Sequence, residues 1–313
     1  MRKITEENVD YLSLKDFTEA VKAELEEYYG DDYLISASEI LKNNSTRLQG
    51  ITVRKITECI APTVYTNDYH KKYIRGISFE DICGEIHEVL AAGFDNVPEN
   101  PEILEKDPEK LKKRIVYRLV SREMNEDLLK MVPYRKFVDL AVIYYVFVRV
   151  NDDAAGSILI TNDYMEKVGL TEKELYRLAK ANTPKLFPAE INPMGDVLKK
   201  LATNAGSPLP DELTVLSEYP MYILSNSKCT NGAVCLLYPG ICREIAELIP
   251  DGFFVLPSSI HELIIVPTDR DSDELLKMVA DVNLTQVPPE DILSNNIYRY
   301  YPEEAALKLI KAA

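Results

Sequence analysis

Residues 254–267 read FVLPSSIHELIIVP. The way this stretch folds helps to distinguish a sheet of adjacent antiparallel strands from a sheet of parallel strands separated by helices. Two apolar runs flank a short polar segment, so the pattern predicts a strand that ends at Pro257, a corner in which a serine hydroxyl bonds to nearby backbone, and a second strand. Every residue of 263–266 is apolar, so both faces of the second strand are apolar. A strand of that kind is covered on both faces, and we therefore expect it at the centre of a sheet.

Further strands are predicted on both sides of this stretch, and most of them also come as neighbours along the chain. The expected pairs are 32–40 with 49–56, 136–150 with 156–162, and 221–226 with 231–240, while 111–120 (which also fits a helix) and 295–301 are single strands. Asp139 stands at the entry to an apolar run and is expected to bond to neighbouring backbone. Adjacent strand pairs favour an α+β fold with a mostly antiparallel sheet over a doubly wound parallel sheet.

Apolar residues at helical spacing predict the helices that flank this sheet. Ser13 and Ser78 are expected to cap two of them, and Thr171 with Glu174 forms a capping box for a third. The predicted helices are 14–29, 66–76, one that follows Ser78, 172–182, 240–249, 272–282 with Leu275, Met278, Val279 and Val282 buried, and 302–313.

The chain has 313 residues, enough for one large domain or two ordinary ones. Residues 95–110 are acidic and rich in proline, which is typical of a surface connection. The sequence therefore predicts two parts. Residues 1–105 should form an N-terminal helix–hairpin–helix portion, and residues 106–313 a C-terminal α+β domain.

The balance of charge limits the partners, because 51 acidic and 36 basic residues give a net charge of −15. Such a surface repels phosphate backbones and anionic lipid heads, so nucleic acid and membrane are not expected as main partners. A basic protein partner is compatible with it. The most apolar run, 140–148, is far shorter than the ~20 residues of a membrane helix. The first residues lack the apolar core of a secretory signal, so we expect a cytoplasmic protein.

Neither a metal nor a cofactor is expected. The cysteines are odd in number and form no CxxC pair, which is typical of buried, reduced thiols, and they are Cys59, Cys83, Cys229, Cys235 and Cys242. His70, His87 and His261 have no ligand at the spacing a helical zinc site requires, so no metal site is expected, and His87 is expected to be a surface residue. The glycine-rich phosphate-binding patterns are also absent from the sequence.

The corner of the opening stretch concentrates the side chains that could carry chemistry, namely Ser258, Ser259, His261 and Glu262. A nucleophile would have to come from one of the serines or from Cys235 or Cys242 in the neighbouring segments. Adjacent residues of a strand point to opposite faces, which disfavours a triad built from this stretch alone. We therefore assign no catalytic residue, and keep these four corner residues as binding candidates.

A basic segment, residues 110–136, runs against the net charge of the chain. Its centre is Lys112, Lys113 and Arg114, which are further binding candidates. Such a run is most often a solvated surface, and the alternative is a docking patch for an acidic partner.

Several stretches together resemble an uncharacterised bacterial family, catalogued as domain of unknown function 5688. They are KNNSTRLQGITVRKI, APTVYTNDYHKKYIRG, VPYRKFVDLAVIYYVFV, LYRLAKANTPKLFPAEI, MYILSN, NGAVCLLYPG, FVLPSSIHELIIVP and MVADVNLTQVPPEDILSNNIYRY. The second half is also distantly similar to domain of unknown function 1444, in which an Arg-Asp pair stands where this chain has His261 and Glu262. Neither resemblance implies an activity, a cofactor or a ligand.

These observations favour a cytoplasmic, non-catalytic binding or regulatory protein. One alternative is a hydrolase or transferase that uses a cleft near Ser259, His261 and Cys235. Another is a docking module that uses residues 110–136. The sequence leaves open whether the protein is an enzyme.

Overall fold

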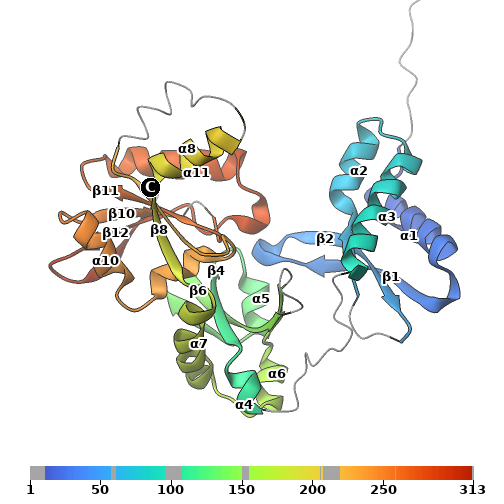
Figure 1. Cartoon of the computed structure of the whole chain (residues 1–313), viewed down its shortest axis with the longest axis horizontal. Coiled ribbons are helices and arrows are strands. Elements are labelled where there is room, and N and C mark those ends of the chain that lie inside the picture. Colours follow the sequence, from blue (N-terminus) through green and yellow to red (C-terminus); the bar gives the residue numbers. More distant parts are fainter. Residues whose placement is uncertain are drawn as a thin grey trace, which may run out of the picture. The chain divides into compact units, whose positions relative to one another are not determined.

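A computed structural model describes residues 11–57, 61–95, 108–149, 155–204, 206, 219–257 and 259–311 (Figure 1). The fold is α+β, with antiparallel sheets flanked by helices, as expected. The chain divides into two compact units. The first unit is Met1–Lys42, Thr46–Leu104 and Arg149–Gly156, and the second is Asn43–Ser45, Glu105–Val148 and Ser157–Ala313. The boundary expected between residues 105 and 106 lies outside the described residues and stays a prediction.

The first unit is a three-stranded antiparallel sheet, in the order β1-β2-β3, packed against three helices. Its elements are α1 (Leu14–Tyr29), the 3₁₀ turn η1 (Gly30–Asp32), β1 (Tyr33–Leu41), β2 (Arg47–Lys55), β3 (Thr63–Tyr65), α2 (Thr66–Ile74) and α3 (Phe79–Asp95). The helical spacing places Val21 and Leu25 of α1 and Ile86 of α3 in one fully buried core with Ile51 and Val53 of β2. This confirms the predicted hairpin and helices.

The start of α1 shows why the helix begins where the sequence predicts. The hydroxyl of Ser13 accepts the backbone N–H of Asp16 at 3.2 Å, which satisfies one of the free donors of the first turn. Gly30 follows the helix with φ +66°, a conformation that glycine adopts without steric cost.

The second unit holds two further sheets and the remaining helices. Its strands are β4 (Ile115–Ser121), β5 (Tyr134–Phe137), β6 (Leu140–Arg149), β7 (Ala155–Leu159), β8 (Ala189–Pro193), β9 (Tyr222–Asn226), β10 (Phe253–Leu256), β11 (Leu263–Pro267), β12 (Ile297–Tyr301) and β13 (Ala306–Ile310). Its α-helices are α4 (Pro108–Lys112), α5 (Glu126–Met131), α6 (Asn162–Lys167), α7 (Glu172–Leu186), α8 (Met194–Asn204), α10 (Ile241–Leu248) and α11 (Ser272–Thr285). Its 3₁₀ turns are η2 (Asn43–Ser45), η4 (Gly232–Leu237) and η5 (Pro289–Asp291).

The opening stretch lies at the centre of the six-stranded sheet, whose order is β13-β12-β10-β11-β9-β8 (Figure 1). Leu263 and Ile265 join the core between this sheet and the four-stranded sheet of β4, β5, β6 and β7. Ile264 and Val266 point the other way, into a smaller cluster with α11. The prediction of a central strand with two apolar faces is therefore confirmed.

The segment 231–240 is not the strand that the sequence predicts but the buried 3₁₀ turn η4. Asn231 takes a left-handed conformation with φ +53°, which bends the chain at once. Gly232 passes so close to its neighbours that a Cβ there would lie 2.2 Å from the Ser225 hydroxyl and 2.5 Å from the His261 carbonyl. Gly232 therefore lies tightly against the end of β9 and the 259–262 corner, at the point where the chain turns.

The C-terminal segment is a strand, β13, where the sequence predicts a helix. Leu307 and Leu309 pack against the larger core, while Lys308 between them is exposed. Pairing with β12 also supplies the hydrogen bonds that a free sheet edge would lack. The period of two in this stretch therefore outweighs the proline, acidic and basic signals of a helix.

Residues 136–150, predicted as one strand, contain a hairpin between β5 and β6. Its turn places Val138 at φ +54°, a strained conformation for a β-branched residue. Asp139 anchors this turn, because its carboxylate accepts hydrogen bonds from Ser294, Asn296 and Tyr298. The strand-entry aspartate thus bonds to distant side chains, not to neighbouring backbone as predicted.

Two helices differ from the prediction in detail. The capping box of α7 is present as expected, but the helix continues through Pro184 to Leu186. In α11, Met278 is 54% exposed, where the sequence predicts burial. The buried stripe of α11 consists of Leu275, Leu276, Val279 and Asn283.

Candidate functional site

The corner between β10 and β11 is shaped by its own serine. The hydroxyl of Ser259 accepts the backbone N–H of His261 at 3.0 Å, and the Ser259 N–H lies 3.4 Å from the Glu262 carbonyl. Ser258 lies outside the described residues. Glu262 is half-buried. The predicted bond between a serine hydroxyl and nearby backbone is present.

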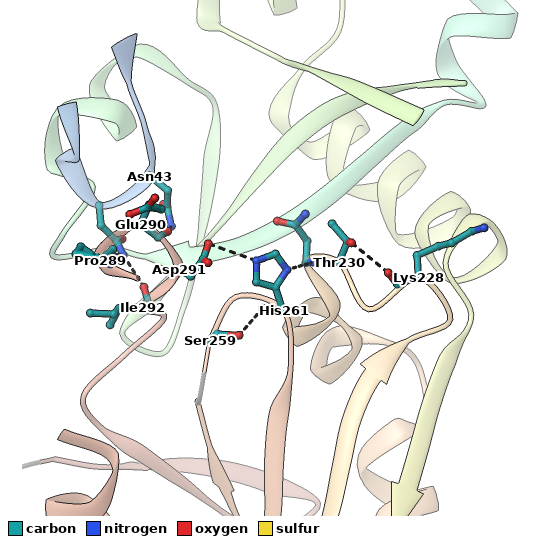
Figure 2. A network of polar contacts seen from close by, with 11 residues as sticks. Asn43, Lys228, Thr230, Ser259, His261, Pro289, Glu290, Asp291 and Ile292 are labelled. Atoms are coloured by element: carbon teal, nitrogen blue, oxygen red, sulfur yellow. Dashed lines mark hydrogen bonds and ion pairs between the residues drawn. The ribbon is translucent and has the colours of Figure 1, made fainter. Parts of the chain in front are cut away.

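The imidazole of His261 is bound at both ring nitrogens, as Figure 2 shows. Nδ1 accepts the backbone N–H of Asn231 at 3.2 Å, so this nitrogen carries a lone pair and no proton. In the neutral ring the proton therefore sits on Nε2, which lies 3.3 Å from Oδ1 of Asp291. The two side chains are 35% and 27% exposed, so the pair lies at the rim of the unit.

Three elements hold the ring in place. The Ser225 hydroxyl, at the end of β9, donates to the His261 carbonyl at 2.8 Å. Asn231 presents its N–H because its left-handed conformation turns the chain toward the ring. Asp291 ends the turn η5, and its carbonyl accepts the N–H of Ile260 at 2.8 Å. The corner, η4 and η5 are therefore bonded together around His261.

The turn η2, which belongs to the same unit, is bonded to η5 by asparagine side chains (Figure 2). The Asn43 amide donates to the Glu290 carbonyl at 2.7 Å, and the Asn44 amide donates to the Pro289 carbonyl at 2.8 Å and to the Ile292 carbonyl at 2.6 Å. Four of the partners in this network are absent from the sequence-based candidates, namely Asn43, Asn44, Asn231 and Asp291. Their only signal in the sequence is the turn-forming tendency of asparagine and aspartate.

The serines and cysteines near the corner are not arranged as nucleophiles. Ser259 bonds to backbone and not to the imidazole. Cys235 is fully buried, its thiol donates to the Ser225 carbonyl at 3.3 Å, and burial raises the pKa of this thiol to about 12. Burial also raises the pKa of Cys242 to about 11. Both thiols are therefore protonated at neutral pH, and a protonated thiol is a poor nucleophile.

The other cysteines differ in exposure. Cys83 is buried, and desolvation raises the pKa of its thiol to about 11. Cys229 is exposed, so the prediction of burial is wrong for this residue. Cys59 lies outside the described residues. The four described cysteines are free thiols.

Part of the basic segment is engaged by acids of the chain itself. Lys112 pairs with Glu109 at 2.7 Å across one turn of α4. Arg135 makes a two-point contact with Glu172, at 3.0 and 2.9 Å. Lys113 is exposed and Arg114 is half-buried. The segment therefore does not present all its charges to solvent.

Glu172 joins this segment to the core of the second unit. Burial alone would raise its pKa, but hydrogen bonds from Arg135 and Tyr144 outweigh burial and lower the pKa below its ordinary value. The guanidinium of Arg135 also lies 3.9 Å above the ring centre of Tyr176. The cluster thus keeps Glu172 ionised and positions α7, which is a structural role.

Metal ligands do not assemble within the described residues, where no group of three His, Cys, Asp or Glu side chains could hold an ion. His70 Nε2 lies 2.8 Å from the Leu12 carbonyl. His87 is not the expected surface residue, because its side chain is only 18% exposed and its Nε2 lies 2.9 Å from Glu24 Oε1. Across the described part of the chain, no helix is both long enough and apolar enough to span a membrane.

Comparison with known proteins identifies a family. The model of a family of unknown function, DUF5688, matches residues 14–301, which is most of the chain. No curated protein and no solved structure matches the chain.

Proposed function

Because the chain belongs to this family of unknown function, whose description names no activity, we propose from its geometry that it is a non-catalytic binding or regulatory protein. The observation that carries the proposal is the use of both ring nitrogens of His261. A general base needs a free lone pair directed at a nucleophile. The lone pair of Nδ1 is directed at the N–H of Asn231, and Nε2 lies 3.3 Å from the Asp291 carboxylate.

The surrounding groups support the same proposal. The Ser259 hydroxyl and the Cys235 thiol both bond to backbone, and the thiol is kept protonated by burial. A hydrolase or transferase at this corner would have to break the bonds that shape it. The role proposed for the corner residues is to fix the surface formed by η2, η4 and η5, on which a partner would bind.

The proposed setting is the cytoplasm, and the proposed partner is a protein. The net charge of −15 supports a partner with a basic surface, since unlike charges speed association. The docking role of residues 110–136 has less support, because Lys112 and Arg135 are already paired with acids of this chain.

Covalent probes test the absence of catalysis. A fluorophosphonate should leave Ser259 unmodified. Iodoacetamide at pH 7.5 should modify the exposed Cys229 and leave Cys235 unmodified, as mapped by peptide mass spectrometry. Stoichiometric labelling of Ser259 or Cys235 that disappears in the His261→Gln variant would contradict the proposal, because it would reveal a nucleophile activated by this imidazole.

Capture from a lysate of the native host tests the binding role itself. The wild-type chain should retain a protein partner at low salt and lose it as salt is raised. The variant Asp291→Ala removes the partner of Nε2, so it should weaken the capture without abolishing folding. If the wild-type chain instead converted a small molecule of the lysate into a product, and the variant did not, that result would favour the alternative of a hydrolase or transferase.

A further inference from the structure

The first unit ends on one side in an open strand edge. Within the described residues β1 pairs only with β2, so its other edge carries no partner strand. The pairing of β1 with β2 keeps one register from Tyr33↔Lys55 to Leu41↔Arg47, without a bulge. Edge strands of soluble proteins usually carry lysine, proline or a bulge that prevents further pairing. The sequence YLISASEIL of β1 has no lysine, arginine or proline, and its one charged residue, Glu39, pairs with Arg47 of β2.

The hydrogen bonds at the two ends of the hairpin show which backbone groups point outward. The Lys42 N–H donates to the Thr46 carbonyl at 2.7 Å, and the Ile56 N–H donates to the Asp32 carbonyl at 3.1 Å. Antiparallel strands bond at alternate residues, so the even-numbered residues of β1 point toward β2. The odd-numbered residues, from Tyr33 to Leu41, therefore direct their N–H and C=O groups to the free edge.

On one face of β1 the side chains are alike in both directions about Ala37, whereas on the other face Ile35 corresponds to Glu39 and Tyr33 to Leu41. The face away from the helices reads Leu34, Ser36, Ser38, Ile40, which is apolar, small, small, apolar. Leu34 is 51% exposed, although it is a large apolar side chain. A second β1 placed antiparallel, with Ala37 opposite Ala37, would set Leu34 opposite Ile40 and Ser36 opposite Ser38. Like side chains would then meet like side chains on that face.

The backbone groups that point outward also fit an antiparallel pairing centred on Ala37. With Ala37 opposite Ala37, every odd-numbered residue faces another odd-numbered residue, and each such pair can exchange two backbone hydrogen bonds. On the helix side, Ile35 would face Glu39, which already pairs with Arg47 of its own chain. No charged residue would face a like charge.

From this match we propose that β1 is a dimerisation edge, on which the β1 strand of a second copy of this chain adds antiparallel about Ala37. The two three-stranded sheets then form one six-stranded sheet with a two-fold axis, which is the symmetry of most homodimers. Each chain carries a charge of −15, so long-range repulsion opposes this contact and added salt should strengthen it.

Analytical ultracentrifugation of the full chain tests the proposal, at ~1–200 µM protein, the range in which small interfaces associate. The average mass of the wild-type chain should rise toward twice 35.5 kDa with concentration, and more so at higher salt. The variant Ala37→Pro removes one outward N–H and leaves the bonds to β2 in place, so it should stay near 35.5 kDa. Ala37→Ser keeps the N–H and is the matched control, which should behave as the wild type.

A second variant covers the case in which proline disturbs the fold. Ser38→Lys keeps every backbone donor and adds a charge at the exposed edge, so it should also remain monomeric, with an unchanged far-UV circular dichroism spectrum. A wild-type chain that remains monomeric at every concentration would overturn the proposal, and would mean that the edge is free or filled by another segment or partner. Dimers that persist in both folded variants would overturn it as well.

Discussion

Replacing His261 by alanine should cost less stability than replacing Ile265, although His261 is the more prominent residue of the sequence. His261→Ala removes one hydrogen-bond acceptor for Asn231 and one donor to Asp291. Ile265→Ala removes a fully buried side chain from a central strand of the six-stranded sheet. The two variants separate a rim contact from a core contact within the same hairpin.

The magnitudes follow from burial. A hydrogen bond contributes about 1 kcal/mol net and a partly exposed charged contact about 0–1 kcal/mol, so the loss of both at a site that is 35% exposed should cost at most about 2 kcal/mol. Truncation of isoleucine to alanine costs about 2–5 kcal/mol, and more where the neighbours cannot collapse into the cavity. Ile265 has no exposed surface, so its cost should lie in the upper part of that range.

Urea unfolding followed by circular dichroism measures both costs. The two compact units can unfold in separate transitions, in which case both variants should shift the same one. His261→Gln is the matched control, because an amide can both accept from Asn231 and donate to Asp291, so it should lie closer to wild type than His261→Ala. A larger loss of stability in His261→Ala than in Ile265→Ala would contradict the assignment of His261 to the rim.

Three further predictions concern the packing and the thiols of the second unit. Gly232→Ala should destabilise the chain by about 1–3 kcal/mol or more in the same assay, because the added Cβ would lie 2.2 Å from a neighbouring hydroxyl and 2.5 Å from a backbone carbonyl. Asp139→Ala should cost about 1–3 kcal/mol by leaving the buried Tyr298 hydroxyl without its acceptor, and adding Tyr298→Phe should recover part of that loss in a double-mutant cycle. Because burial raises the pKa of Cys235 to about 12, the unfolded chain should ionise this thiol first, so its contribution to stability should be complete below pH ~9 and lost as pH rises toward 12. Of Cys229 and Cys235, only the exposed Cys229 should react with iodoacetamide in the folded chain at pH 8. Rapid reaction of both thiols would contradict the burial of Cys235.

Patterns of side-chain period predict most of the elements, because burial of one face is a local property of a segment. The hairpin of β1 and β2, the capped helices α1 and α7 and the central position of β11 all follow from such patterns. The sequence-based predictions are wrong where contacts with residues far along the chain determine the secondary structure. Residues 306–310 have helical signals nearby, but the free edge of β12 makes them a strand. Nothing local in residues 231–240 shows that Gly232 must pass close to the end of β9.

The candidate site likewise contains contacts that the local sequence predicts and contacts that only the fold determines. The serine bond that shapes the corner is a local property, and the sequence predicts it. The partners of His261 come from segments 30 residues before and after it, so no spacing along the chain indicates them. The same holds for Asp139, whose partners lie more than 150 residues away. The sequence thus identifies the corner, and the fold determines what its histidine contacts.

The non-catalytic assignment depends on both ring nitrogens of His261 being engaged, so a direct determination of the tautomer of His261 is its sharpest test. Long-range ¹H–¹⁵N correlation spectra of the folded chain, assigned with His261→Gln, report which nitrogen carries the proton. The expected result is that Nδ1 is unprotonated and accepts the Asn231 N–H, so that the proton of the neutral ring is on Nε2. A ring protonated at Nδ1 would contradict it, because Nε2 would then hold a free lone pair, as a general base requires.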